Sequence, residues 1–349
     1  MTSAYATYAA YALFVSICLI LLTLPFMAAF REWLWPSDIE PLPISANYAS
    51  DIDHFARRLL ADADAKTGAG APTGYENFDF VPAHLADMNW AKATQRLIAA
   101  QSIDAATAIQ TTQPLLVQGD ISGSSKSSFQ ALYAQGDITL GAQSQIHDWA
   151  HADGAVRLGQ GSMALRRVSA GVSIELGEDT WFERLSAPTL LFGQDSRAAD
   201  RPKAPVQLLA SFKELPNAVR QTPSLYLIRG NCVLPANRLY QGSLIVTGFL
   251  SVGAGTTISG DVKARQSVQM GPNSAVIGAI TCEKYIRLWR DVKVLGPVVS
   301  ESYILFGQNA VIGTVEAPTT VSAQIVIAEA GARVHGTVWA RDLGMVKAA

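Results

Sequence analysis

A repeat of about 18 residues, present in two blocks, is the feature that most constrains the fold of this chain. In the later block, glycines open similar phrases, mostly 17 or 18 residues apart: Gly260, Gly278, Gly296, Gly313 and Gly336. In the earlier block, a Leu-Gly pair recurs every 18 residues: Leu140-Gly141, Leu158-Gly159 and Leu176-Gly177. A period of this length is typical of repeat proteins, in which each unit stacks on its neighbours.

A period of six residues lies inside the period of 18. Pairs of apolar or small residues, two positions apart, recur every six residues between 244 and 312, which gives 24 such positions. The earlier block has 16 more between 132 and 176. Residues i and i+2 share one face of a strand, so each pair predicts a short strand with two inward side chains. Three such strands make one turn of a coil.

The two periods predict an all-β fold, a parallel β-helix with about 18 residues per turn. A helix would need apolar residues at spacings of three and four, and a sandwich would not keep a six-residue period through twelve units. We expect a first array over 113–193, a polar insertion over 194–223, a second array over 224–343 and a tail over 344–349. The insertion is interpreted as a loop from one turn; a hinge between two separate coils is the alternative.

Residues 10–30 contain no charge and are long enough to cross a bilayer. We therefore expect a membrane anchor over 1–35, with a kink at Pro25; a cleaved signal peptide is the alternative, but the first 30 residues contain no Lys or Arg. Aromatic and basic residues flank the span and are expected at the membrane interface: Tyr5, Tyr8, Tyr11, Arg31, Trp33 and Trp35. The few basic residues favour an inner-membrane protein with its bulk in the cytoplasm; a periplasmic location is the alternative.

Residues 36–112 are expected to form a helical neck. Ser50 is placed to cap a first helix, with Asp53 at the capping-box position, and the helix carries one apolar stripe: Ile52, Phe55, Ala56, Leu59, Leu60 and Ala63. That stripe needs a surface, which is the first turn of the coil, a sister helix, the bilayer or its own domain. A second helix is expected over 84–104, with these apolar positions: Leu85, Met88, Trp90, Leu97 and Ile98.

Composition argues against several classes of function. The chain has 27 basic and 29 acidic side chains and is therefore nearly neutral, which does not favour a nucleic-acid partner. Cys18, Cys232 and Cys282 form no CxxC motif and are interpreted as buried free thiols. We expect no cofactor and no metal.

The stretch GDVKARQSVQMGPNSAVIGAITCEKYIRLWRDVKVLG, which starts at Gly260, resembles the bactofilins, a polymer-forming family of the bacterial cytoskeleton. The resemblance is good over 242–341, weaker over 115–193 and absent before 110. It implies a right-handed β-helix, no nucleotide, self-assembly by stacking of the coil ends, membrane attachment, and a cytoplasmic scaffold role in cell shape or envelope work. The partners it implies are further copies of the chain, membrane lipid and proteins of envelope or polysaccharide synthesis. The membrane span, the neck and the insertion depart from the simple pattern.

The last turn of the second array is expected to end openly. Its sequence, GTVWARD at 336–342, is followed only by a short tail. An uncovered strand edge is a template for pairing with another chain. Val338, Trp339 and Ala340 are therefore the candidates for an end-to-end contact; the alternative is that Trp339 packs under the tail or faces outward.

Two other functions are weighed against a non-catalytic scaffold. A hexapeptide-repeat acyltransferase needs a general base, for which the candidates are His147, His151 and His335. The spacing of His147 and His151 would suit a metal on a helix, but the six-residue period predicts a strand and a corner there. His335 lies beside a turn glycine and has no evident acidic partner. A periplasmic β-helix that binds polysaccharide would be marked by an outward aromatic ladder. The outward aromatics appear scattered along the sequence: Tyr285, Trp289, Tyr303 and Trp339.

Overall fold

The structure, a computed structural model, describes residues 2–34, 52–67, 78–82, 85, 88–193 and 206–348. The chain divides into two compact units, Met1–Ser45 and Ala46–Ala349. The first unit contains α1 (Thr2–Thr23), a 3₁₀ turn, η1 (Leu24–Phe26), at Pro25, and α2 (Met27–Leu34). The expected kink at Pro25 thus takes the form of a 3₁₀ turn, as expected where proline cannot donate to the helix.

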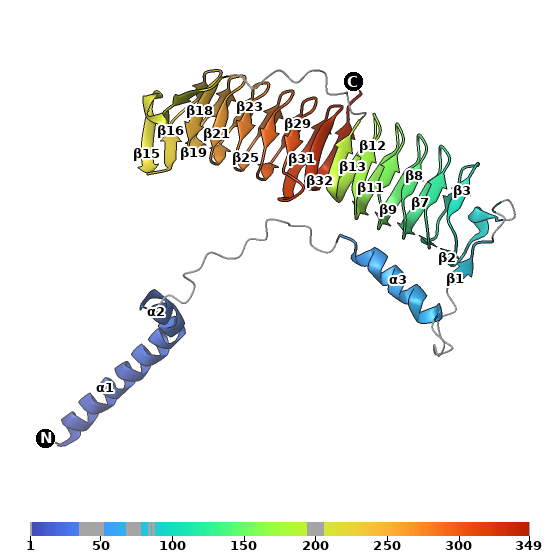
Figure 1. Cartoon of the computed structure of the whole chain (residues 1–349). Coiled ribbons are helices and arrows are strands. Elements are labelled where there is room, and N and C mark those ends of the chain that lie inside the picture. The colour runs from blue at the N-terminus through green and yellow to red at the C-terminus, as the bar shows by residue number, and fades with distance from the viewer. Residues whose placement is uncertain are drawn as a thin grey trace. The chain divides into compact units, whose positions relative to one another are not determined.

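The second unit is a β-solenoid of about 18 residues per turn, which confirms the predicted fold (Figure 1). Each turn has three sides, called A, B and C here. In the first array, the short strands of side A are β1 (Phe78–Phe80), β2 (Arg96–Ala99) and β5 (Leu115–Val117). Side B holds β3 (Ile103–Ala105), β6 (Ile121–Gly123), β8 (Ile138–Leu140), β10 (Val156–Leu158) and β12 (Ser173–Leu176). Side C begins with β4 (Gln110–Thr111), and three long strands bend from side C into side A: β7 (Ser128–Ala134), β9 (Gln145–Ala152) and β11 (Met163–Ala170). A fourth, β13 (Trp181–Phe192), continues from side C through side A into side B, where it pairs with β12.

The second array has the same three sides. Side A holds β15 (Ala218–Thr222), β16 (Leu225–Ile228), β19 (Ser243–Val246), β22 (Val262–Ala264), β25 (Ile280–Cys282) and β28 (Val298–Ser300). Side C holds β17 (Cys232–Leu234), β20 (Phe249–Val252), β23 (Ser267–Met270), β26 (Tyr285–Leu288) and β29 (Tyr303–Phe306). Side B holds β14 (Leu208–Ala210), β18 (Arg238–Gln241), β21 (Thr257–Ser259), β24 (Ala275–Val276), β27 (Lys293–Val294) and β30 (Val311–Ile312). The array ends in two long strands, β31 (Thr319–Ala328) and β32 (Ala332–Val346).

The core of the solenoid is formed by the residues that the six-residue period selects. All 24 positions of the second array and all 16 of the first are buried, including the small polar residues Ser144, Ser162, Thr256 and Ser274. Ser274 Oγ donates to the Gly271 carbonyl at 2.6 Å. Small hydroxyl residues are therefore tolerated inside the coil because they bond to the backbone at its corners.

One corner of each turn depends on a left-handed residue. Positive φ angles near 60° recur about every 18 residues, at Lys126, Gln143, Gly161, Asp179, Asn237, Gly255, Asn273, Asp291 and Asn309. Only Gly adopts this conformation freely, and Asn and Asp adopt it more readily than other residues. The recurrence of Asn, Asp and Gly at these positions is thus a second sequence signature of the turn.

The recurring Gly-Asp phrase also has a structural role. Asp120 Oδ1 accepts from the Asp137 backbone N–H at 2.7 Å, and Asp137 Oδ1 accepts from the Ala155 N–H at 2.8 Å. Asp261 Oδ1 accepts in the same way from the Ala279 N–H at 2.9 Å. Each aspartate therefore ties its own turn to the next one, at a corner where strand bonds are interrupted.

The two arrays do not form one continuous coil. The last strand of the first array, β13, pairs antiparallel with the last strand of the second, β32, with Leu185 opposite Val338 and Leu190 opposite Val334. The C-terminus consequently lies in the middle of the rod (Figure 1). The chain visits the sides in the order A, B, C in the first array and A, C, B in the second. The two orders are opposite because two coils of the same hand advance toward each other and meet at their final rims.

The expected insertion is therefore interpreted differently after the structure. Residues 206–222 cover the outer end of the second array: β14 pairs with β18, β15 pairs antiparallel with β16, and Phe212 is buried against Tyr226 and Tyr240. The interpretation as a loop from one turn of a continuous coil was wrong, because the second array starts at the far tip and winds back to the first. The alternative of two separate coils comes closer, although the coils are joined by strand pairing.

The neck also differs from expectation. α3 (His54–Thr67) confirms the first helix, and Ser50 lies outside the described residues. Ala56, Leu59 and Ala63 pack on side A of the first array against Ile98, Leu116 and Tyr133. The expected second helix over 84–104 was wrong: this segment contains the 3₁₀ turn η3 (Trp90–Lys92) and strands β2 and β3. The solenoid therefore starts well before 113, and β32 extends into the expected tail.

Candidate interaction surfaces

The three candidate catalytic histidines lie apart and bond to neighbouring turns. His147 Nε2 is 2.9 Å from Ser128 Oγ, and His335 Nδ1 is 3.1 Å from the Pro188 carbonyl oxygen. Among the described residues, no group of three or more His, Cys, Asp or Glu is placed to hold a metal ion. The contacts of His147 and His335 are therefore explained by a structural role, in which each side chain bonds to a neighbouring turn of the solenoid.

His151 has contacts that resemble a catalytic triad. Its Nδ1 is 2.7 Å from Ser169 Oγ, and its Nε2 is 3.3 Å from Asp153 Oδ1. A nucleophile must be reachable by substrate, but Ser169 is only 4% exposed. Burial lowers the pKa of His151, an effect that Asp153 and Asp53 partly offset. The cluster is better explained as a hydrogen-bonded group that ties two neighbouring turns together.

The described cysteines of the solenoid are inert. Cys232 and Cys282 are buried and free, and burial raises the pKa of the Cys232 thiol to about 11. Burial also raises the pKa of Cys282. A thiol with a raised pKa is a poor nucleophile and metal ligand, which agrees with the expectation of buried free thiols.

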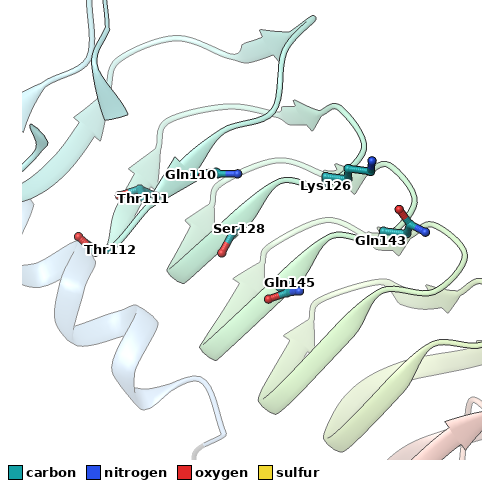
Figure 2. Close-up of a pocket in the computed structure, with 7 residues that line it drawn as sticks. All are labelled: Gln110, Thr111, Thr112, Lys126, Ser128, Gln143 and Gln145. Atoms are coloured by element: carbon teal, nitrogen blue, oxygen red, sulfur yellow. The ribbon is translucent and has the colours of Figure 1, made fainter. Parts of the chain in front are cut away.

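A shallow polar groove lies on side C of the first array (Figure 2). Its volume is about 610 Å³, and amide, hydroxyl and ammonium groups line it: Gln110, Thr111, Thr112, Lys126, Ser128, Gln143 and Gln145. Gln110, Ser128 and Gln145 are register partners on successive strands. The groove therefore presents hydrogen-bonding groups at the spacing of the turns, about 4.8 Å. Sequence reasoning missed it, because all of its lining residues except the buried Thr111 fall at positions that the six-residue period does not select.

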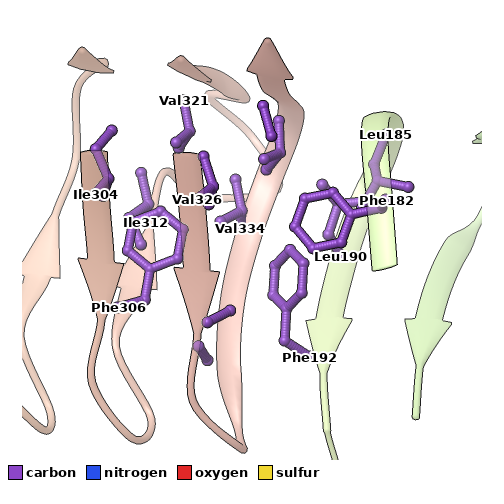
Figure 3. Packing of buried hydrophobic residues seen from close by; sticks show 14 of the residues in the cluster. Phe182, Leu185, Leu190, Phe192, Ile304, Phe306, Ile312, Val321, Val326 and Val334 are labelled. Carbon is purple, nitrogen blue, oxygen red and sulfur yellow. The ribbon is translucent and has the colours of Figure 1, made fainter. Parts of the chain in front are cut away.

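The candidate contact residues of the last turn lie at the junction of the two arrays. Val338 is buried opposite Leu185, Ala340 is buried beside Ala323, and Trp339 is 41% exposed opposite Arg184. Figure 3 shows Phe182, Leu185, Leu190 and Phe192 of β13 next to Val334 of β32. The expectation of an open last turn was wrong, because the first array of the same chain covers it. The prediction of a contact between copies through these three residues stays a prediction.

An apolar strip crosses this junction on side C. Its outward residues occupy two adjacent columns that the strand register defines: Met163, Trp181, Met345, Ile327 and Leu305 in one, and Leu343, Ile325, Tyr303 and Tyr285 in the other. Trp181, Ile325 and Tyr303 are 44%, 37% and 38% exposed. The Tyr285 and Tyr303 rings stack at 5.2 Å, and Arg287 lies over the Trp289 ring at 3.7 Å. Of the four outward aromatic residues that lie far apart in the sequence, Tyr285, Trp289 and Tyr303 thus lie together on side C, whereas Trp339 lies on side A.

The first unit holds a helix that is long and apolar enough to cross a membrane, over Tyr8–Phe26, with a mean hydropathy of 2.3. Ser16 and Thr23 donate their hydroxyls to carbonyls one turn earlier, which satisfies these groups within the helix. Tyr8, Tyr11 and Arg31 are exposed on the helices, and their place at a membrane interface stays a prediction. Tyr5 and Trp33 lie in the helices, but their side chains are outside the described part of the structure, as is Trp35 altogether.

Comparison with known proteins gives no relative: no family model, no curated protein and no solved structure matches the chain. The class that the fold defines is a β-solenoid repeat protein with an apolar N-terminal helix.

Proposed function

We propose that this chain is a membrane-attached, non-catalytic scaffold whose rods associate side by side through the apolar strip. The observation that carries the proposal is the strip itself, which lies exposed over several adjacent turns and runs across the junction. Contiguous exposed apolar surfaces of this kind mark interaction sites. The two ends of the rod offer less exposed apolar surface for association, because segments of the chain cover both ends.

A second copy is the partner that we propose for the strip. The strip crosses the point where the two arrays meet with opposite chain direction, so two copies can apply the same surface to one another about a two-fold axis. The N-terminal helix would hold copies on one membrane, which raises their effective concentration. We place the rod in the cytoplasm at an inner membrane, where it would organise envelope or cell-shape machinery.

The resemblance to bactofilins supports the scaffold class. The stacking of coil ends that it implies would require displacement of the covering segments: Phe212, Leu215 and Ala218 at one end, and Val81, Leu85, Met88, Trp90 and Ala93 at the other. We therefore favour lateral association over end-to-end stacking.

Sedimentation of the full chain in detergent tests this proposal. We expect a concentration-dependent dimer or larger species, which the double variant Trp181→Ser, Ile325→Ser weakens at least tenfold. Val233→Ser is the matched control, because Val233 is 65% exposed on side C, outside the strip. A wild-type chain that stays monomeric at all concentrations, or equal weakening by the control, would overturn lateral association.

Polysaccharide binding is a second candidate, favoured by the polar groove. Amide and hydroxyl groups at a regular spacing suit the hydroxyls of a glycan chain, and the groove is wide open to solvent. Pull-down of the full chain with insoluble envelope polysaccharides tests it. Loss of binding in Gln110→Ala with Gln145→Ala would support the groove, whereas retention by a wild-type chain and this variant alike would exclude it.

A further inference from the structure

Two arginines near the junction carry charge that no carboxylate neutralises. Arg167 on β11 and Arg184 on β13 are register partners, so their side chains leave side A from adjacent strands about 4.8 Å apart. Within the described part of the chain, neither forms a salt bridge. Glu183 attracts Arg184 electrostatically, but no bond joins them. Two like charges are therefore held next to each other.

Each guanidinium lies against an aromatic ring on the side away from the other arginine. The Arg167 guanidinium is 5.5 Å from the Phe55 ring of α3, and Phe55 in turn stacks on Trp149 at 6.4 Å. The Arg184 guanidinium is 5.3 Å from the Trp339 ring of β32. The column order on side A is Trp149, Arg167, Arg184, Trp339. The two rings thus flank the arginine pair, Phe55 at Arg167 and Trp339 at Arg184. The two positive charges face each other between the rings.

Arg184 is left with an unsatisfied group. Its Nε is buried and has no hydrogen-bond partner among the described residues. Burial, and next the charge of Arg167, lower the pKa of Arg184. An unpaired buried donor is unfavourable, and more so when it is charged. An anion in contact with both guanidinium groups would neutralise the charge and remove the repulsion between the two arginines.

A hydroxyl group stands beside Arg184. Ser186 follows two residues later on β13 and projects to the same side of the sheet. Ser186 Oγ lies 3.1 Å from Thr337 Oγ1 on β32. Hydroxyls and guanidinium groups are the usual ligands of oxyanions in proteins.

We propose that Arg167 and Arg184 form a binding site for a phosphate group on side A, next to the junction. A phosphate is favoured over a single carboxylate because two adjacent cations are better matched by a divalent anion. The site joins three parts of the chain: α3 through Phe55, the first array through both arginines, and the second array through Trp339. A bound phosphate would consequently strengthen the junction and the attachment of α3.

Thermal unfolding of the full chain in phosphatidylcholine nanodiscs tests the site. Inorganic phosphate, added at constant ionic strength against chloride, is expected to raise the Tm with saturation. Arg184→Gln should weaken the apparent phosphate affinity at least tenfold, and Arg167→Gln gives an independent second variant if the first fails to fold. Arg265→Gln is the control, because Arg265 is exposed on the second array and its Nε lies 3.7 Å from Glu283 Oε2.

The source of the phosphate is distinguished by a second arm. In nanodiscs that contain phosphatidylglycerol, a Tm rise without added phosphate that Arg184→Gln abolishes would assign the site to a lipid headgroup. A rise only with inorganic phosphate would assign it to a soluble ligand. Equal shifts in all four proteins, or no shift in either arm, would overturn the proposal.

Discussion

At the scale of single residues, the solenoid is held by contacts that repeat from turn to turn. Inward pairs fill the core, aspartates bond to the next turn, and left-handed residues form one corner. The sequence predicted the inward pairs because they are apolar and periodic. It did not predict the groove or the arginine pair, because outward positions follow no hydrophobic period, and only the register shows which of them are neighbours.

The partly buried His151 makes stability depend on pH. Its folded-state pKa lies below the ordinary value of 6.5, so its contribution to stability is present above about pH 6.5 and is lost as the pH falls through the folded value. We expect the free energy of unfolding to decrease from pH 7 to pH 5 and His151→Gln to flatten that decrease. Urea unfolding across this range is the measurement. His147→Gln on the same strand serves as the control, and an unchanged slope in His151→Gln would contradict the prediction.

The left-handed corner can be tested at Gly161, which has a φ of +66°. A Cβ there would lie 3.6 Å from Gln143 Cγ, an ordinary contact, so Gly161→Ala should cost only backbone strain, about 1 kcal/mol. Gly161→Asn should cost less. At Gly159, by contrast, a Cβ would lie 2.6 Å from the Ala142 nitrogen, so Gly159→Ala should cost more. Chemical denaturation of the three variants ranks them; an equal cost for Ala and Asn at 161 would refute the backbone explanation.

At the scale of elements, prediction succeeded for strands inside an array and failed at its boundaries. The six-residue period in fact starts at Leu97/Ala99 and Ile103/Ala105, which are buried in β2 and β3. It was hidden because Leu97 and Ile98 also fit a helical stripe with Leu85 and Met88. The pairing of β13 with β32 joins residues about 150 positions apart. A final strand that pairs antiparallel with such a partner has the same inward and outward pattern as an uncovered one, so no local signal reveals it.

The junction can be tested by an engineered disulfide. Ser186 and Thr337 are antiparallel partners with their hydroxyl oxygens 3.1 Å apart, and such pairs have a Cα separation that suits a disulfide. We expect Ser186→Cys with Thr337→Cys to form a bond within one chain on mild oxidation and to raise stability by roughly 3–5 kcal/mol, since it closes a long loop. Non-reducing gels and thermal unfolding are the measurements. Either single variant is the control, and crosslinked dimers instead of monomers would show that the arrays pair between chains.

At the scale of the whole molecule, the solenoid unit is a single rod with both tips covered. Fifteen strands follow one another along side A, from β1 through β13 and β32 to β15, which at about 4.8 Å per strand gives a rod of roughly 70 Å. From Gly193 at the junction, the chain reaches β14 at the far tip through 12 residues, 194–205, which can span about 45 Å at most. The seven strand spacings between β13 and β14 on side B require about 34 Å. The connection is long enough for pairing within one chain.

The covered tip of the second array provides a test of this shape. Phe212 is 1% exposed and stacks on Tyr240 at 4.7 Å, so Phe212→Ala should cost about 3–5 kcal/mol and release β14 and β15. We expect electron micrographs of the wild-type chain in nanodiscs to show rods that are not joined at their tips and those of the variant to show rods joined at their tips. Phe80→Ala, at a residue 67% exposed on the opposite tip, is the control. Rods that remain separate after Phe212→Ala would show that the covering segment does not prevent joining.

The position of β32 in the chain has a consequence for biosynthesis. A ribosome releases the first array long before the strand that covers its final rim exists, because that strand follows the whole second array in the chain. Until then, the final rim of the first array exposes unpaired backbone N–H and C=O groups and apolar side chains. Termination anywhere in the second array would leave this rim uncovered permanently, so a chain that stops before β32 should be insoluble.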